Sequence, residues 1–210
     1  MSKENWKDHW RFTQYDAFLS PQVADEASQY CDKLISSTEH VWTTNFAWAS
    51  NKQSGGGLME PKNERYENLC LVHKVHRSNP SLYDKIVRDL QVHLPDLEPE
   101  TPDSLQYFVW TGGSRIEWHR DFKGHVSEHG RYGAVTIYLN RHWDIEWGGD
   151  FLYKDLEDKV HRVTPSYNRA VSIGAVFHRS TEIQSKRFRK CLQIFLRKRQ
   201  QPIDFNEDFC

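Results

Sequence analysis

The sequence is poor in cysteine, and its few cysteines follow no recognisable pattern. The 210 residues include only Cys31, Cys70, Cys191 and Cys210, without a CxxC pair. Small secreted scaffolds are held by paired cysteines at framework spacings, which are missing here. We therefore expect reduced thiols in a reducing compartment, and a cytoplasmic protein.

Long apolar runs and an excess of charge of either sign are also missing. The first residues, MSKENWKDHW, are polar, and no 18-residue apolar segment follows. We thus predict neither a secretion signal nor a membrane span. The formal net charge is −1 and the pI about 6.8, so no basic field would attract nucleic acid or an anionic membrane. The oligomeric state is left open.

The first half of the chain predicts helices with flanking strands. Residues 19–37 have Ser20 as a candidate N-cap, Pro21 at the first helical position and apolar residues at helical spacing. Residues 79–94 predict a second helix, capped by Ser81. Residues 40–50 and the segment ENLCLVHKVH favour strands. The glycine-rich loop 51–60 between them is either a plain surface loop or a lid.

The second half changes to short strands separated by turn signals. Such a series suggests an antiparallel sandwich, a jelly roll or a small barrel. Length and the lack of internal repeats suit a single domain. The strands are predicted at residues 104–110, 115–119, 133–139, 149–153, 159–163, 169–177 and 191–196.

One of these strands ends in residues that packing does not need. His119 and Asp121 are two positions apart, so an extended chain directs both side chains to the same face. His178, at the end of strand 169–177, is the best candidate for a third ligand. Two histidines and one carboxylate form the triad of non-haem iron(II) oxygenases, which leaves coordination positions open. The alternative is a salt-bridged surface His–Asp pair.

Two other histidine pairs could bind zinc, but both are poor candidates. His73 and His76 would face opposite sides of a strand. His125 and His129 lie in a glycine-flanked loop without a nearby cysteine.

Four ordered blocks give the triad a context. The blocks WTGGSRIEWHRD, IYLNRHWDIEWGGDFLY, TPSYNRAVSIGAVFHRS and RKCLQIFL resemble the prolyl 4-hydroxylase branch of the iron(II)/2-oxoglutarate dioxygenases. The resemblance implies a mainly β, α+β fold: a double-stranded β-helix (jelly roll) with supporting N-terminal helices. We expect one dioxygenase domain over 1–210, with helices and flanking strands in 1–103, the jelly-roll core in 104–198 and a tail in 199–210.

The same resemblance implies the chemistry. Iron(II) would bind His119, Asp121 and His178, with 2-oxoglutarate and O2 as co-substrates and ascorbate as a candidate supporting reductant. The expected reaction hydroxylates an unactivated C–H of a free amino acid, small metabolite or peptidyl residue, and releases succinate and CO2. The carboxylate of Asp121 favours hydroxylation, because halogenating relatives have a small residue there.

The resemblance also implies a basic anchor for the far carboxylate of 2-oxoglutarate. Arg189 fits best, because Cys191 then stands two residues after the anchor, where the family often has a small Ser or Ala. Arg187 is the second candidate. Tyr138 matches a tyrosine that contacts the same carboxylate. The chain departs from the family at Trp110, where many members have tyrosine, and Tyr107 is a candidate substitute.

Substrate recognition is the least constrained prediction. Arg115, Trp118 and Arg179 flank the ligands and are candidate substrate contacts, together with loop 51–60 and the segment 123–130. The rival interpretation from another class is a non-catalytic, cupin-like module that binds a metal or another ligand.

Overall fold

The computed structural model describes residues 6–37, 43–44, 69–121, 131–184 and 186–199. The first predicted helix is confirmed as α1 (Pro21–Ser36), with Ser20 at the N-cap and Pro21 at N1. The Ser20 hydroxyl does not cap the helix, however. Its side chain and its backbone N–H both donate to Asp89, which ties the start of α1 to the second long helix.

That second helix begins two residues earlier than the sequence suggested. After the short α3 (Val75–Ser78), helix α4 runs over Pro80–His93. Its N-cap is Asn79, whose side-chain oxygen accepts from the backbone N–H of Leu82. The Ser81 cap was therefore wrong, because an Asn–Pro pair already supplies a cap and a preset first turn.

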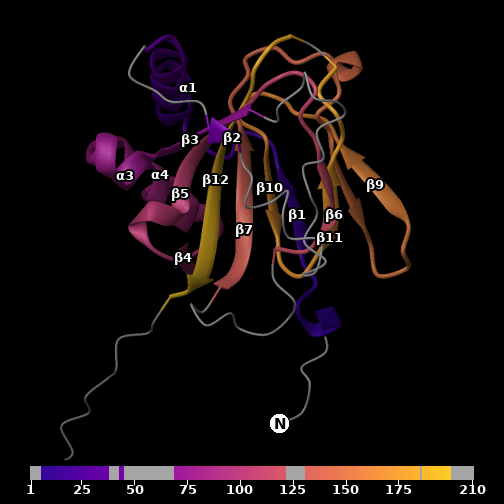
Figure 1. Ribbon diagram of the computed structural model, residues 1–210. Helices are drawn as coiled ribbons and strands as arrows, with labels where there is room; N and C mark the ends of the chain where they lie inside the picture. The colour runs from indigo at the N-terminus through magenta and orange to yellow at the C-terminus, as the bar shows by residue number, and fades with distance from the viewer. Residues whose placement is uncertain (1–5, 38–42, 45–68, 122–130, 185, 200–210) are drawn as a thin grey trace, which may run out of the picture.

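The fold class is confirmed: two antiparallel sheets face each other, with helices on one side (Figure 1). The larger sheet has the order β1-β10-β7-β12-β5-β3-β2, with β4 added beside β12. Its strands are β1 (Phe12–Tyr15), β2 (Thr43–Thr44), β3 (Leu69–Lys74), β4 (Leu97–Pro99), β5 (Leu105–Trp110), β7 (Arg131–Tyr138), β10 (Ala170–Ile173) and β12 (Arg189–Lys198). Of the predicted strand 40–50, only β2 lies within the described residues.

The smaller sheet has the order β6-β11-β8-β9. Its strands are β6 (Ile116–His119), β8 (Phe151–Lys154), β9 (Val160–Val163) and β11 (Phe177–Ser180). Short 3-10 turns complete the described elements: η1 (Trp6–His9), η3 (Pro102–Ser104) and η4 (Ile145–Trp147).

The predicted strand 169–177 is in fact two strands in different sheets. β10 pairs with β7 in the large sheet, whereas β11 pairs with β6 and β8 in the small one. The chain crosses at Gly174, where an added Cβ would lie 2.3 Å from the carbonyl oxygen of His9. Only glycine permits that close approach, and the crossing makes His178 the second residue of β11 rather than the end of a long strand.

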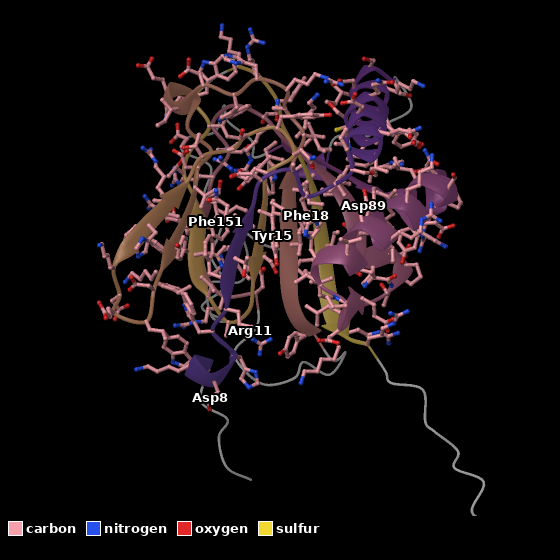
Figure 2. All side chains as sticks on the ribbon, turned by 180° about the vertical axis from the view of Figure 1, so that it is seen from behind. Asp8, Arg11, Tyr15, Phe18, Asp89 and Phe151 are labelled. Atoms are coloured by element: carbon pink, nitrogen blue, oxygen red, sulfur yellow. The ribbon has the colours of Figure 1, made fainter. Side chains whose placement is uncertain are left out.

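Apolar cores lie on both sides of the large sheet. Helices α1 and α4 cover its outer face. Figure 2 shows the molecule from the side opposite to that of Figure 1, with Tyr15, Phe18 and Asp89 labelled. Two smaller clusters fill the space between the sheets, one around Trp110 and Tyr138 and one around Phe151 and Val171. None of the helices in the described part of the chain is long and apolar enough to cross a membrane.

Candidate active site

His119, Asp121 and His178 converge between the two sheets. One ligand atom from each lies within 4.8 Å of the others. The nearer carboxylate oxygen, Oδ1 of Asp121, is 3.4 Å from Nε2 of His119 and 3.9 Å from Nε2 of His178. Pairing of β6 with β11 sets His119 directly opposite His178, and the two rings are 4.2 Å apart. All three side chains are more than 90% buried.

Backbone carbonyls orient both imidazoles. Nδ1 of His119 is 2.8 Å from the carbonyl oxygen of Glu117, and Nδ1 of His178 is 3.0 Å from that of Val176. A proton on Nδ1 can then donate to the carbonyl, which leaves the Nε2 lone pair directed at the cluster, as a metal ligand requires.

The two histidines differ in their affinity for a proton. Burial, reinforced by the neighbouring His119, lowers the pKa of His178 to about 4 despite the charge of Asp121. Burial also lowers the pKa of His119, but the hydrogen bond and charge of Asp121 outweigh it, and the net shift is upward. His178 is therefore neutral at physiological pH and can offer its lone pair.

A cavity continues from the two histidines into the space between the sheets. Tyr138, Arg189 and Cys191, all predicted as co-substrate residues, line it. Sequence reasoning missed other lining residues, although strand alternation could have found some of them: Thr136 shares a face with Tyr138, and Gln193 with Cys191. The remaining lining residues are Trp110, Ile116, Phe151, Arg179 and Ser180.

The Arg189 side chain is 5% exposed and is held by two hydrogen bonds. Its Nη1 donates to the carbonyl oxygen of Gly149 at 2.7 Å and to the hydroxyl of Ser180. The side chain of Asn140 fixes the start of β12, accepting from the N–H of Lys190 and donating to the carbonyl of Phe188. The backbone carbonyl of Gly149 thus helps to position the arginine.

No carboxylate among the described residues lies within 4.0 Å of the Arg189 guanidinium, and its buried Nε has no hydrogen-bond partner there. A buried cation usually has an anionic partner. The cavity therefore presents an unneutralised positive group to whatever enters it.

The structure separates the two competing arginines. Arg187 is exposed and stacks on the Trp147 ring, with its guanidinium 4.8 Å from the ring centroid. It precedes β12, which begins at Arg189, so strand alternation does not place its side chain on the cavity face.

Tyr107 cannot substitute for the missing family tyrosine. It lies three residues before Trp110 and so faces the other side of β5. There its hydroxyl donates to the carbonyl oxygen of Ala27, in the helix-side core. Trp110 alone of the two reaches the cavity.

Of the candidate substrate residues, only Arg179 lines the cavity. Arg115 forms ion pairs with Glu117 at 2.8 Å and Glu182 at 3.8 Å. Trp118 stacks on Phe177 with ring centroids 5.4 Å apart and is not a cavity residue.

Several predictions fall outside the described residues or were argued on wrong geometry. Loop 51–60 and the segment 123–130, with His125 and His129, lie outside them. His76 is in α3 rather than in a strand, so the alternation argument used for His73 and His76 was wrong. His73 bonds to Ser78, and the His–Asp–His group is the one metal-competent cluster in the described ranges.

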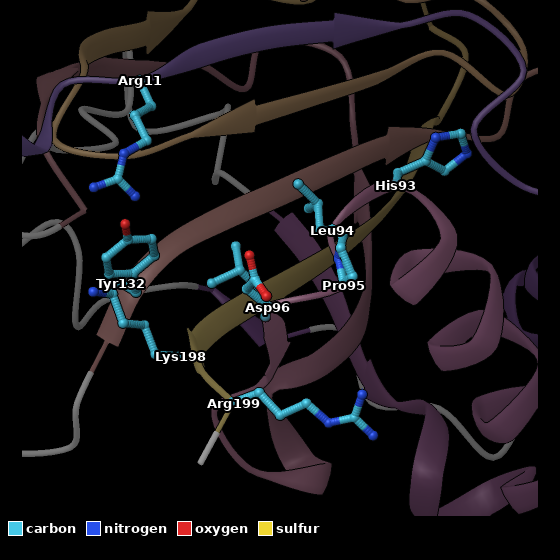
Figure 3. A pocket seen from close by; sticks show the side chains of 9 residues that line it. Arg11, His93, Leu94, Pro95, Asp96, Tyr132, Lys198 and Arg199 are labelled. Carbon is cyan, nitrogen blue, oxygen red and sulfur yellow. The ribbon is translucent and has the colours of Figure 1, made fainter. Parts of the chain in front are cut away.

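A larger groove of about 640 Å³ opens on the outer face of the large sheet, beyond the end of α4 (Figure 3). Arg11, Tyr132 and Lys198 gather on one side of it. It shares no lining residue with the cavity, so its size alone does not make it the site of chemistry.

Comparison with known proteins agrees with this geometry. Residues 105–197 match the 2OG-Fe(II) oxygenase superfamily. A search of curated protein sequences finds no match.

Solved structures with the same fold share little sequence with this chain. A prolyl-4-hydroxylase from Pseudomonas putida is 16% identical, with TM-score 0.57, over 90% of this chain and 93% of that one. A Trichoplax adhaerens prolyl hydroxylase, in complex with a hypoxia inducible factor peptide fragment, is 16% identical, with TM-score 0.62, over 89% and 83%. A 2OG-Fe(II) oxygenase family oxidoreductase from Burkholderia pseudomallei is 13% identical, with TM-score 0.56, over 90% and 86%.

The matched segment contains all three clustered side chains and the buried arginine. Residues 105–197 are thus similar to the 2OG-Fe(II) oxygenase superfamily, and the chain shares the fold of the Pseudomonas putida and Trichoplax adhaerens prolyl hydroxylases.

Proposed function

We propose that this protein is an iron(II)/2-oxoglutarate-dependent hydroxylase that acts on an unactivated C–H of an amino acid, free or within a peptide. The observation that carries the proposal is the buried Arg189, which has no anionic partner among the described residues and lies in the same cavity that His119 and His178 line. A metal site alone would not need this cation, whereas a dicarboxylate that also binds the metal would.

His119, Asp121 and His178 fit an iron(II) ion. Two neutral imidazole nitrogens and one carboxylate oxygen are the donor set of the facial triad, and both imidazoles already direct Nε2 at a common point. Bound iron(II) with 2-oxoglutarate and O2 would supply the oxidising power, with succinate and CO2 as co-products. The chain itself contributes ligand orientation and a cavity shielded from water.

Arg189 would bind the far carboxylate of 2-oxoglutarate. The planar guanidinium stays charged when buried and can donate two parallel hydrogen bonds to a carboxylate. Tyr138, fully buried beside it, would add a hydroxyl donor, and Cys191 leaves room as a small residue. The free volume is only about 40 Å³, little more than one water molecule occupies, so lining side chains would move apart on binding.

The substrate would approach past Arg179, which lines the cavity next to His178. Arg115 and Trp118 stay weaker candidates, since one is engaged by two carboxylates and the other packs on Phe177. A peptide is a reasonable first choice, because the Trichoplax relative of this fold holds a peptide fragment. Free amino acids follow.

The deciding experiment measures succinate formed from 2-oxoglutarate by purified protein with iron(II) and ascorbate, across a panel of prolyl peptides and free amino acids. We expect slow turnover without substrate and a stimulated rate with the correct one. Neither basal nor stimulated turnover, together with metal binding unaffected by 2-oxoglutarate, would support the cupin-like module instead.

A further inference from the structure

Residues adjacent to the metal-ligand candidates form a cluster of their own on the opposite face of the small sheet. Trp118 and Arg120 flank His119, and Phe177 and Arg179 flank His178. Since neighbouring strand residues point to opposite faces, Trp118, Arg120 and Phe177 lie behind the ligands, while Arg179 contacts Trp118 and also lines the cavity. Trp118 stacks on Phe177, and the guanidinium of Arg179 lies 5.3 Å from the centre of the Trp118 ring.

Arg120 lies between two rings of this cluster. Its guanidinium carbon is 4.2 Å from the centre of the Trp6 ring and 5.0 Å from the centre of the Phe177 ring. It forms no ion pair with another described residue, and its buried Nε has no hydrogen-bond partner there. The two aromatic faces are therefore the principal contacts of this cation, an arrangement that gains strength where water is partly excluded.

The position of Arg120 in the chain gives this contact a consequence for the ligands. His119 and His178 are paired across the β6–β11 ladder, which fixes their separation. Asp121 lies beyond the last residue of β6, so the ladder does not extend to it. Arg120 is the residue that joins His119 to Asp121, and its side chain reaches the neighbour of His178 and the N-terminal turn η1.

We propose that Arg120 is a positioning residue for the metal site: clamped between Trp6 and Phe177, it holds the Asp121 carboxylate at the distance from the two imidazoles that one metal ion requires. This inference rests on the proposed metal site and deepens it. Residues behind the ligands typically change metal affinity by about 10- to 100-fold when substituted.

The test measures binding of Co²⁺ alone to the metal-free full-length protein, by calorimetry and by the absorption spectrum of the bound ion. Arg120→Leu removes the cation but keeps apolar bulk, and should weaken Co²⁺ binding about 10- to 100-fold and alter the spectrum. Arg120→Lys restores a cation between the rings and should recover most of the affinity. Phe177→Leu, which removes one ring, should weaken binding in the same direction even if Arg120→Leu fails to fold.

Arg11→Leu is the matched control. Arg11 also stacks on an aromatic ring, with its guanidinium 4.0 Å from the centre of Tyr132, but it lines the groove of Figure 3 rather than the cavity. It should leave Co²⁺ affinity and spectrum unchanged. In an Asp121→Asn background, Arg120→Leu should add little, because its effect acts through that carboxylate.

Two negative results have different meanings. If the unsubstituted protein does not bind Co²⁺, the proposed metal site itself is wrong. If it binds Co²⁺ and folded Arg120→Leu and Phe177→Leu bind it equally well with the same spectrum, the metal site stands and the positioning role of Arg120 is overturned.

Discussion

The two faces of strands β7 and β12 are both covered by protein, yet they carry different chemistry. Beside an ion pair of Lys190 with Asp32 of α1, their outer face packs against the helices with a row of aliphatic side chains: Val135, Ile137, Leu192, Ile194 and Leu196. Their inner face presents a phenol, a hydroxyl, a thiol, an amide and a guanidinium to the cavity: Tyr138, Thr136, Cys191, Gln193 and Arg189. Alternate residues of the same strands thus face different surroundings, the helix-side core on one side and the proposed binding cavity on the other.

The largest expected effect is on the cavity side. Asp121→Asn keeps the size of the side chain but removes the charge that binds a divalent metal. We expect succinate formation to fall to the rate without enzyme, while the protein still unfolds in one cooperative transition. Asp158→Asn, at a carboxylate that is 86% exposed, should leave the rate unchanged. A normal rate for Asp121→Asn would remove this residue from the ligand set.

The outer face should show the opposite result. Leu192→Ala leaves a cavity in the helix-side core, where Leu192 is fully buried, and should lower the free energy of unfolding by about 2–5 kcal/mol. Urea denaturation measures the loss, and activity per folded molecule should be unchanged. Leu156→Ala, at a half-exposed position, should cost no more than about 0.5 kcal/mol. Equal losses at both positions would contradict the assignment of Leu192 to the core.

A third substitution sharpens the comparison within one short segment. Arg189→Gln removes a charge-assisted contact worth about 1.5–3 kcal/mol, so the KM for 2-oxoglutarate should rise roughly 10- to 150-fold. Arg187→Gln, two residues away on the surface, should change it less than about twofold. Steady-state kinetics at varied 2-oxoglutarate concentration measure the KM of both variants. A large rise in KM for Arg187→Gln and none for Arg189→Gln would make Arg187 the anchor.

The smallest expected effect concerns neither face but a surface ion-pair network. Hydrogen bonds from Arg77 and Lys74 hold the pKa of Asp103 below its ordinary value. A carboxylate with a lowered pKa stabilises the fold above its unfolded-state pKa of about 3.9, and this contribution is lost as the pH falls through the folded-state value. Asp103→Asn should therefore lower Tm slightly at pH 7. The difference in Tm between Asp103→Asn and the unsubstituted protein should shrink as the pH falls. A difference that grew on acidification would contradict the lowered pKa of Asp103.

Local patterns predicted much of this molecule. Pro21 after Ser20 located α1, and the spacing of His119 and Asp121 marked two residues that the structure brings within reach of one ion. Each of these inferences depends only on neighbours along the chain, which periodicity and capping rules describe.

Errors arose where a distant contact decided the outcome. Ser20 donates to Asp89 on another helix, and Asn79 rather than Ser81 caps α4. Gly174 breaks an apparently continuous strand because the backbone of His9 passes within contact distance. No pattern within residues 169–177 shows that approach.

The sequence by itself determined the alternation that gives β7 and β12 an aliphatic face and a more polar one, and with it the residue types available to the site. The tertiary structure alone decided which of these residues meet. His178 lies 57 positions after Asp121, and only the crossing into the small sheet sets it opposite His119. The contacts of Arg120 with Trp6 and Phe177 likewise join segments far apart in the chain. Such proximity follows from how the two sheets pack, which no local preference specifies.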